Sequence, residues 1–188
     1  VASSQLVAER YEEAEATLQS GLAIQKIGSD PLMRSEFYTL FGDIAFRQNR
    51  TEEAFAYYDK ALENNPQNYG ALNNYSYYLA LLGKNLDKAE RMSGEVIKAN
   101  PDNATYLDTY AWVYFKQGRY SLARLYLKKA LDLSKEASAE IYEHYGDVLA
   151  VTGNESEAVG WWKKAVDAGG DSEILHRKIA EKRYIGNE

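Results

Sequence analysis

The 188-residue chain contains no cysteine, only three prolines and no apolar stretch of the roughly 20 residues that a membrane-spanning helix needs. The lack of cysteine excludes a disulfide framework, thiol catalysis and thiolate-bound zinc. Three prolines and 13 glycines are too few for a linker-rich or disordered chain. Because 22 basic residues stand against 28 acidic ones, the net charge of −6 argues against a general nucleic-acid-binding surface.

What the chain does contain is an internal repeat with a period near 35 residues. Alanine recurs in similar surroundings at Ala14, Ala54, Ala89, Ala123 and Ala158. A second series of small residues precedes most of these alanines: Gly42, Ser76, Ala111 and Gly146. Small side chains in one register are typical of helices that cross at close range. The period therefore predicts a stack of similar helical units.

Each unit carries the apolar pattern of two helices joined by a short turn. In the first full unit, apolar residues at helical spacing run over 38–46 and again over 54–62, with Asn49 between them. The later units have glycine at the equivalent turn: Gly83, Gly118 and Gly153. Both residue types accept the positive φ that follows a helix end. We therefore predict consecutive α-helical hairpins.

The spacing and the residue types together resemble the tetratricopeptide repeat (TPR) family. The unit that matches best supplies the bulky, small, aromatic and proline positions of that motif with Tyr38, Phe41-Gly42, Ala45, Ala54, Tyr58, Ala61 and Pro66. Ala45 stands where the family prefers tyrosine. The resemblance covers residues 35–170 in four units. It implies an all-α, right-handed superhelix (α-solenoid) of antiparallel helix pairs.

The repeat predicts a division of the chain into six parts. These are 1–30 (second helix of a truncated N-terminal repeat), 35–68 (TPR 1), 69–103 (TPR 2), 104–138 (TPR 3), 139–170 (TPR 4) and 171–188 (C-terminal capping helix). The first helix of the N-terminal repeat is mostly absent, with Ser4–Glu9 as a remnant, so we expect the sequence to be part of a longer protein in which a further piece precedes residue 1. Ile27–Pro31 is expected to be a loop.

The last part is expected to form a polar helix that covers the end of the stack. Asp171 or Ser172 is predicted to cap it. Its charged residues, Lys178 among them, are expected on the exposed face. The final residues 186–188 are expected to fray.

In TPR proteins the concave surface is lined mainly by exposed positions of each first helix, so the resemblance implies a partner-binding groove there. The groove residues are then Asp43, Phe46, Arg47, Asn73, Asn74, Tyr77, Asp108, Thr109, Trp112, Phe115, Lys116, Glu143, His144 and Asp147. Aromatic and amide side chains in the middle of this set are typical of a surface that contacts peptides. For Tyr77, Trp112 and Phe115, packing within the protein is an equal alternative. Trp162, at the aromatic motif position, is expected in the core.

One TPR subclass grips the C-terminal carboxylate of its partner with Lys, Arg and Asn on successive first helices. Asn74 matches one of these positions. The others hold Thr39, Asp43, Thr105 and Thr109, so the cationic clamp is missing. A carboxylate-binding chaperone adaptor is therefore not expected.

One constellation resembles a metal or acid–base site. Glu140, Glu143, His144 and Asp147 share one face of a helix at i, i+3, i+4 and i+7. A transition-metal site needs three or four convergent ligands, and the only other histidine is His176. A hydrated acidic edge of the groove is favoured. With no phosphate loop or catalytic elbow either, we expect no metal, no other cofactor, no catalytic residues and no enzymatic activity.

The function expected from these features is a non-catalytic scaffold that presents its concave face to a protein or peptide. The alternative is a structural or oligomerisation module that docks through the exposed N-terminal helix face, in which case the partner includes a second copy of the chain. Neither nucleic acid nor a membrane span is expected. The segments 107–112 and 141–149 resemble bacterial TPR proteins. That resemblance implies a periplasmic or outer-membrane-attached location, with the cytoplasm as the alternative.

Overall fold

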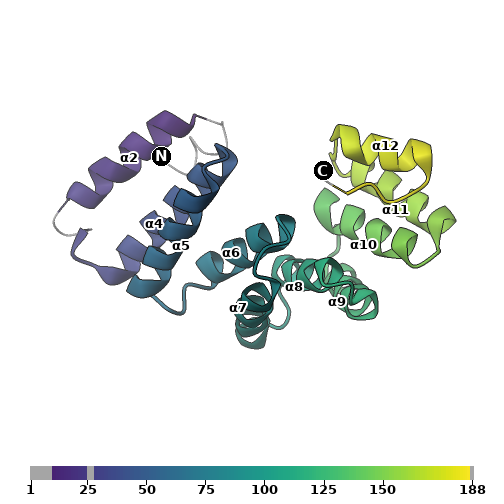
Figure 1. Ribbon diagram of the computed structural model, residues 1–188, viewed down its shortest axis with the longest axis horizontal. Helices are drawn as coiled ribbons and strands as arrows, with labels where there is room; N and C mark the ends of the chain where they lie inside the picture. Colours follow the sequence, from purple (N-terminus) through teal and green to yellow (C-terminus); the bar gives the residue numbers. More distant parts are fainter. Residues whose placement is uncertain (1–9, 25–27, 187–188) are drawn as a thin grey trace. The chain divides into compact units, whose positions relative to one another are not determined.

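The computed structural model describes residues 10–24 and 28–186, and all regular structure within them is helical (Figure 1). The helices are α2 (Tyr11–Ala23), α4 (Pro31–Arg47), α5 (Thr51–Asn64), α6 (Tyr69–Leu81), α7 (Leu86–Ala99), α8 (Ala104–Lys116), α9 (Tyr120–Leu133), α10 (Ala139–Val151), α11 (Glu155–Asp167) and α12 (Glu173–Glu181). The prediction of an all-α chain is confirmed. The remnant predicted over 4–9, residue 27 of the predicted loop and the last two residues of the predicted frayed end lie outside the described residues. Among the helices described, none is long and apolar enough to cross a membrane.

The chain divides into two compact units, residues 1–75 and 76–188, with the boundary inside α6. In the N-terminal unit, α4 packs against α5 and α2 packs against α4. In the C-terminal unit, α7 packs on α8, α8 on α9, α9 on α10, α10 on α11 and α11 on α12. These helices thus contact mainly their neighbours along the chain, which is the organisation of a repeat array.

The first helix of each hairpin begins with a side-chain cap. Asp30, Asn103, Ser138 and Ser172 each accept a hydrogen bond from a backbone N–H two or three residues later, at 2.9 to 3.3 Å. These bonds satisfy amides that have no partner within the helix. The cap predicted at the start of α12 is therefore confirmed, with Ser172 as the capping residue.

In the N-terminal unit, Asn68 caps α6 and also donates hydrogen bonds to side chains of α4. Its side-chain oxygen accepts the Ala71 N–H at 3.0 Å, while its amide nitrogen donates to Ser35 Oγ at 2.9 Å and Thr39 Oγ1 at 3.2 Å. Ser35 Oγ in turn donates to the Ala61 carbonyl at 2.8 Å. These buried bonds join α4, α5 and the start of α6, so they fix the position at which the next helix begins.

The turns adopt the predicted left-handed conformation. Asn49 has φ of 61°, and Gly83, Gly118 and Gly153 have φ of 64°, 75° and 82°. The small positions also have a direct physical reason. A Cβ on Gly146 would lie 2.6 Å from the indole of Trp162, and one on Gly42 would lie 2.9 Å from the ring of Tyr58. Trp162 is fully buried, as predicted.

Candidate functional site

In the C-terminal unit, the first helices of successive hairpins surround a cavity of about 330 Å³, which we call the inner pocket. Six predicted groove residues line it: Tyr77, Trp112, Lys116, Glu143, His144 and Asp147. The remaining lining residues are Leu81, Glu140, Ser172, Ile174, Lys178, Tyr184 and Ile185. The pocket therefore combines aromatic, aliphatic and charged side chains from α6, α8, α10, α12 and the chain that follows α12.

A stack of rings forms the α8 side of the pocket. The ring of Trp112 lies 3.9 Å from that of His144 and 4.6 Å from that of Phe115, nearly parallel to both. All three residues are buried. Trp112 thus packs within the unit and also lines the pocket. In the described part of the chain, its buried indole N–H has no hydrogen-bond acceptor.

One ring of this stack, that of His144, also belongs to a buried pair between α8 and α10. His144 Nδ1 donates to Asp108 Oδ1 at 2.9 Å, and both side chains are almost inaccessible to solvent. Burial lowers the pKa of His144, but the negative charge of Asp108, aided by Glu140 and Asp147, raises it to about 9. The imidazole is therefore positively charged at neutral pH.

A second buried pair joins α10 to α12. Lys178 Nζ donates to Asp147 Oδ2 and to Glu143 Oε1, both at 2.7 Å. Trp162 donates its indole N–H to the other oxygen of Asp147 at 2.9 Å. Burial raises the pKa of Asp147 to about 6, although Lys178 and His144 act to lower it. Two donors, one from α11 and one from α12, therefore converge on the carboxylate of Asp147.

These pairs correct two predictions. Lys178 is 4% exposed rather than part of the solvated face of α12, because its spacing from Ile174 and Leu175 directs it inward. The prediction of a hydrated acidic edge is also wrong for His144 and Asp147, which are buried against partners of opposite charge. Only Glu140 of that constellation is exposed.

Ligand atoms of Asp108, Glu140 and His144 lie within 4.8 Å of one another, which is the one group of this kind in the residues described. Each already has a partner, since His144 donates to Asp108 and the hydroxyl of Tyr77 donates to Glu140. Burial and the charge of Glu140 raise the pKa of Tyr77 far above its ordinary value, so this donor keeps its proton. A metal ion would have to displace both donors.

The chain that follows α12 reaches the same pocket. The ring of Tyr184 meets the ring of Phe115 edge-on, with centroids 5.3 Å apart. Burial, with the charges of Asp147 and Glu143, raises the pKa of Tyr184 to about 12. This contact could not be predicted from the sequence, because the segment after α12 has no helical periodicity.

The other predicted groove residues lie in different surroundings. Thr109 is buried within the C-terminal unit. In the N-terminal unit, Asp43 accepts hydrogen bonds from the Tyr58 hydroxyl and, at 3.0 Å, from the Asn74 amide. Burial raises the pKa of Asp43 against the lowering effect of these bonds. Asn73 is buried, Phe46 half-buried and Arg47 exposed.

Comparison with known proteins gives matches along most of the chain. The family model described as "Tetratricopeptide repeat" matches residues 2–69, 39–104, 79–138 and 109–173. The TPR repeat-containing protein MJ1428 of Methanocaldococcus jannaschii is 32% identical over 134 residues, which is 71% of this chain and 23% of that protein. The TPR repeat-containing protein PA4667 of Pseudomonas aeruginosa is 32% identical over 82 residues, or 44% of this chain and 14% of that protein. The chain thus spans less than a quarter of either relative.

Solved structures agree on the fold. PilW, described as a widely conserved type IV pilus biogenesis factor, has a TM-score of 0.78 at 19% identity, covering 96% of this chain and 82% of PilW. The thermophilic TPR protein TTC0263 of Thermus thermophilus has a TM-score of 0.76 at 18% identity, covering 96% of this chain and 94% of TTC0263. PilF of Pseudomonas aeruginosa has a TM-score of 0.73 at 18% identity, covering 96% of this chain and 80% of PilF. With four family matches and hairpins stacked through small residues, the chain belongs to the tetratricopeptide repeat family.

Proposed function

We propose that this chain is a non-catalytic scaffold that binds a protein or peptide through the first helices of its repeats. The inner pocket carries this proposal, because successive first helices converge on one cavity that holds both rings and hydrogen-bonding groups. Rings supply contact area, and the polar groups supply partners for a peptide backbone. The repeats occupy residues 35–68, 69–103, 104–138 and 139–170 in this proposal, flanked by 1–30 and 171–188.

The proposal extends to the predicted groove residues of the N-terminal unit. Asn74 and Asp43 are half-buried there and joined to each other, which holds both side chains in fixed positions. Arg47, one turn further along α4, is exposed. Side chains that are ordered before a partner arrives lose little conformational entropy on binding.

The test begins by capturing proteins from the native host and identifying them by mass spectrometry. The affinity of the purified partner is then measured for the wild type and for a Trp112→Ala, Tyr77→Ala double variant. A second variant, Lys116→Ala with Glu140→Ala, changes only partly or fully exposed polar residues and preserves the core. We expect both variants to bind at least about tenfold more weakly.

The matched control is Trp161→Ala with Tyr142→Ala, which removes a stacked pair outside the inner pocket. Its affinity for the partner is expected to equal that of the wild type. Circular dichroism of each variant verifies folding. Wild-type affinity in a folded Lys116→Ala, Glu140→Ala chain would place binding on another surface.

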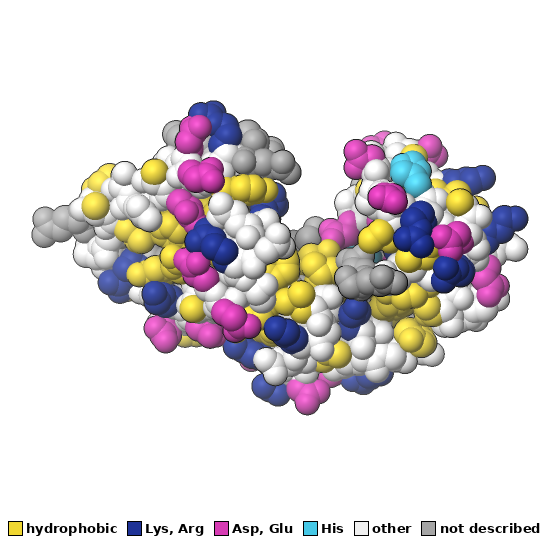
Figure 2. All heavy atoms as spheres, turned by 45° about the horizontal axis from the view of Figure 1, so that its top comes forward, with side chains coloured by type: hydrophobic (Ala, Val, Ile, Leu, Met, Phe, Trp, Pro, Cys, Tyr) yellow, Lys and Arg dark blue, Asp and Glu magenta, His cyan; other side chains and the backbone are white. Residues whose placement is uncertain are grey.

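A second candidate function rests on exposed apolar side chains of the N-terminal unit, whose surface shows hydrophobic side chains in Figure 2. Ile24 is 53% and Leu32 60% exposed, next to the packed α2 and α4. This surface supports docking to another domain or to a second copy of the chain. Light scattering of the wild type and of a Leu32→Lys variant tests it, since self-association through this face is expected to be lost in the variant.

For the location, we propose the periplasm or the outer membrane of a bacterium, with the cytoplasm as the alternative. The similarity to PilW, described as a type IV pilus biogenesis factor, supports this proposal. Fractionation of the native host, with detection of the chain in each compartment, tests it.

A further inference from the structure

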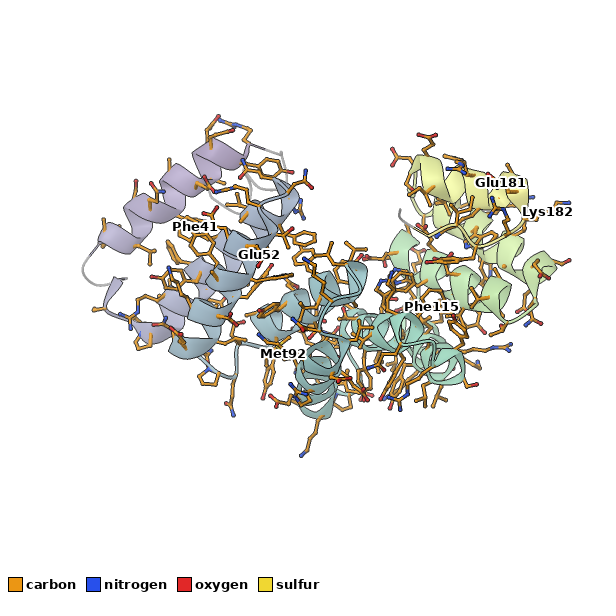
Figure 3. The ribbon with its side chains drawn as sticks, in the orientation of Figure 1. Phe41, Glu52, Met92, Phe115, Glu181 and Lys182 are labelled. Carbon is orange, nitrogen blue, oxygen red and sulfur yellow. The ribbon has the colours of Figure 1, made fainter. Side chains whose placement is uncertain are left out.

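The chain turns back after α12 and contributes to the inner pocket. Lys182 lies at the end of α12 (Figure 3). It has φ of 51° and ψ of 36°, a left-handed conformation that residues other than glycine adopt rarely. This turn brings Tyr184 to Phe115 of α8, and it places Ile185 on the pocket wall with Trp112. The unit therefore holds two of its own side chains in the proposed binding site.

Tyr184 packs beside the inner pocket in a group of contacts that we call the aromatic slot and define by Phe115, Tyr120 and Lys178. Phe115 contacts the rings of both Tyr120 and Tyr184, at 5.4 and 5.3 Å between centroids. Lys178 Nζ lies 5.4 Å from the centroid of Tyr184. Because Lys178 is fixed by two carboxylates, the slot offers a stationary cation to the face of a ring. An aromatic side chain fits this environment better than an aliphatic one.

Residues 184–186, which cover part of the proposed binding site, are held there by weak contacts. Within the described residues, no hydrogen bond joins residues 184–186 to the rest of the unit; the contacts are those of rings, apolar groups and the Lys178 ammonium over the Tyr184 ring. Tyr184 and Ile185 are half-buried. Contacts of this kind persist in one chain because a short tether keeps the local concentration in the millimolar range. A separate molecule can therefore compete with them.

The pocket also holds donors that the segment leaves without acceptors. The Trp112 indole N–H is buried and has no acceptor among the described residues. Lys116 Nζ lies 6.0 Å from the Trp112 ring, and across residues 10–24 and 28–186 no carboxylate pairs with it. A buried donor without an acceptor is unfavourable. The carbonyl groups of an extended peptide are acceptors of the kind that these two donors lack.

We propose that Tyr184 and Ile185 are an internal ligand, and that the partner is an extended segment whose aromatic–aliphatic pair displaces them. The partner's aromatic ring enters the aromatic slot, its aliphatic neighbour replaces Ile185 in the inner pocket, and its backbone carbonyls accept from Trp112 and Lys116. This inference rests on the proposed function and gives the chemistry of the partner. Only molecules in which Tyr184 has left the slot can bind that partner, so the apparent affinity is lower than the affinity of the open slot.

The test uses the full 188-residue chain and a fluorescein-labelled peptide, Lys-Arg-Tyr-Ile-Gly, which copies residues 182–186. Fluorescence anisotropy measures its affinity for the wild type and for Tyr184→Ala. Removing the internal ring is expected to tighten binding at least about tenfold. The peptide Lys-Arg-Ala-Ile-Gly is expected to bind neither protein. Tyr106→Ala, which removes a half-buried tyrosine of α8 outside the pocket, is the matched control and is expected to behave as the wild type.

Two further variants guard against a folding artefact. Tyr184→Phe keeps the ring and is expected to retain wild-type affinity for the peptide, while Ile185→Ala is expected to tighten binding by a smaller factor than Tyr184→Ala. Equal affinities of the wild type, Tyr184→Ala and Ile185→Ala would overturn the inference. So would binding of the alanine peptide as tight as that of the tyrosine peptide, or a dimer in which each copy fills its neighbour's slot.

The experiments distinguish failure of the internal-ligand inference from failure of the proposed function. If the purified partner still depends on Trp112 and Tyr77 while Tyr184→Ala leaves peptide affinity unchanged, only the internal ligand is wrong. If the folded pocket variants retain the partner while Tyr184→Ala tightens peptide binding, the slot exists but the partner binds elsewhere. The first result overturns this inference, and the second supports the slot while overturning the proposed site.

Discussion

Lys178 Nζ lies 2.7 Å from Asp147 Oδ2, and the two side chains are 5% and 1% exposed. The pair joins the last helix to the first helix of the preceding hairpin, with Glu143 as a second acceptor. Removal of one member of a buried pair leaves the other charge without compensation. The position of α12 therefore depends on this ammonium group as well as on apolar packing by Leu175.

The first prediction follows from this pair. Lys178→Met keeps the aliphatic part of the side chain but leaves Asp147 and Glu143 unpaired, so it is expected to lower the free energy of unfolding by about 3–5 kcal/mol. Lys163→Met, at an exposed position of α11, is the control and is expected to change it by less than about 0.5 kcal/mol. Urea denaturation of both variants provides the measurement. Equal stabilities would show that the buried contact contributes nothing.

The second prediction concerns pH. Asp108 raises the pKa of His144 from 6.5 to about 9 in the folded chain, so the folded state binds this proton more tightly than the unfolded state. The contribution is fully present below about pH 6.5 and is lost as the pH rises through 9. We expect the free energy of unfolding to fall by up to about 3 kcal/mol across this window.

His144→Gln is expected to flatten that slope, whereas His176→Gln, at an exposed position of α12, is expected to leave it unchanged. Urea denaturation at pH 6, 7, 8 and 9 gives the slope for each protein. A slope that survives in His144→Gln would assign the titration to another group.

The third prediction uses two glycines of neighbouring helices. A methyl group on Gly146 would lie 2.6 Å from the buried indole of Trp162, which is held by its bond to Asp147. Gly146→Ala is therefore expected to destabilise the chain by about 1–3 kcal/mol. Gly160, within α11, has nothing within 4 Å of the added carbon. Gly160→Ala is expected to stabilise by about 0.4–1 kcal/mol. Thermal unfolding of the pair tests both signs at once.

The fourth prediction concerns metal ions. Because Asp108 and Glu140 already accept hydrogen bonds from His144 and Tyr77, an equimolar addition of zinc is expected to leave the melting temperature unchanged. Elemental analysis of the purified chain and melting with and without a chelator provide the measurement. Stoichiometric zinc that is lost in His144→Gln would contradict this expectation.

The helical hairpins could be predicted because their signals are local. The turn at Asn49 and the contact between Gly146 and Trp162 both follow from spacing within one unit. The prediction that Lys178 is exposed was wrong because it followed residue type, and lysine is rarely buried. The spacing of Lys178 from Leu175 was the signal that could have placed it correctly.

Contacts between distant parts of the sequence could not be predicted from the repeat. The bonds of Asn68 to Ser35 and Thr39 cross 33 and 29 residues and depend on how the helices pack. The burial of His144 depends on Asp108 and Trp112, which lie in the preceding hairpin. Tyr184 follows the last helix in a segment without periodicity, so its position could be found only in three dimensions.

The two buried pairs also determine how the inner pocket would respond to ionic strength. His144 and Lys178 each already contact a carboxylate, so a charged group of a ligand would have to break an existing pair before it could form a new one with either residue. Selection by charge is thus weak at these two residues, whereas the shape of an aromatic ring still decides which ligand fits. Affinity for an aromatic peptide should accordingly change little between low and high salt, unlike that of a surface built on exposed charges.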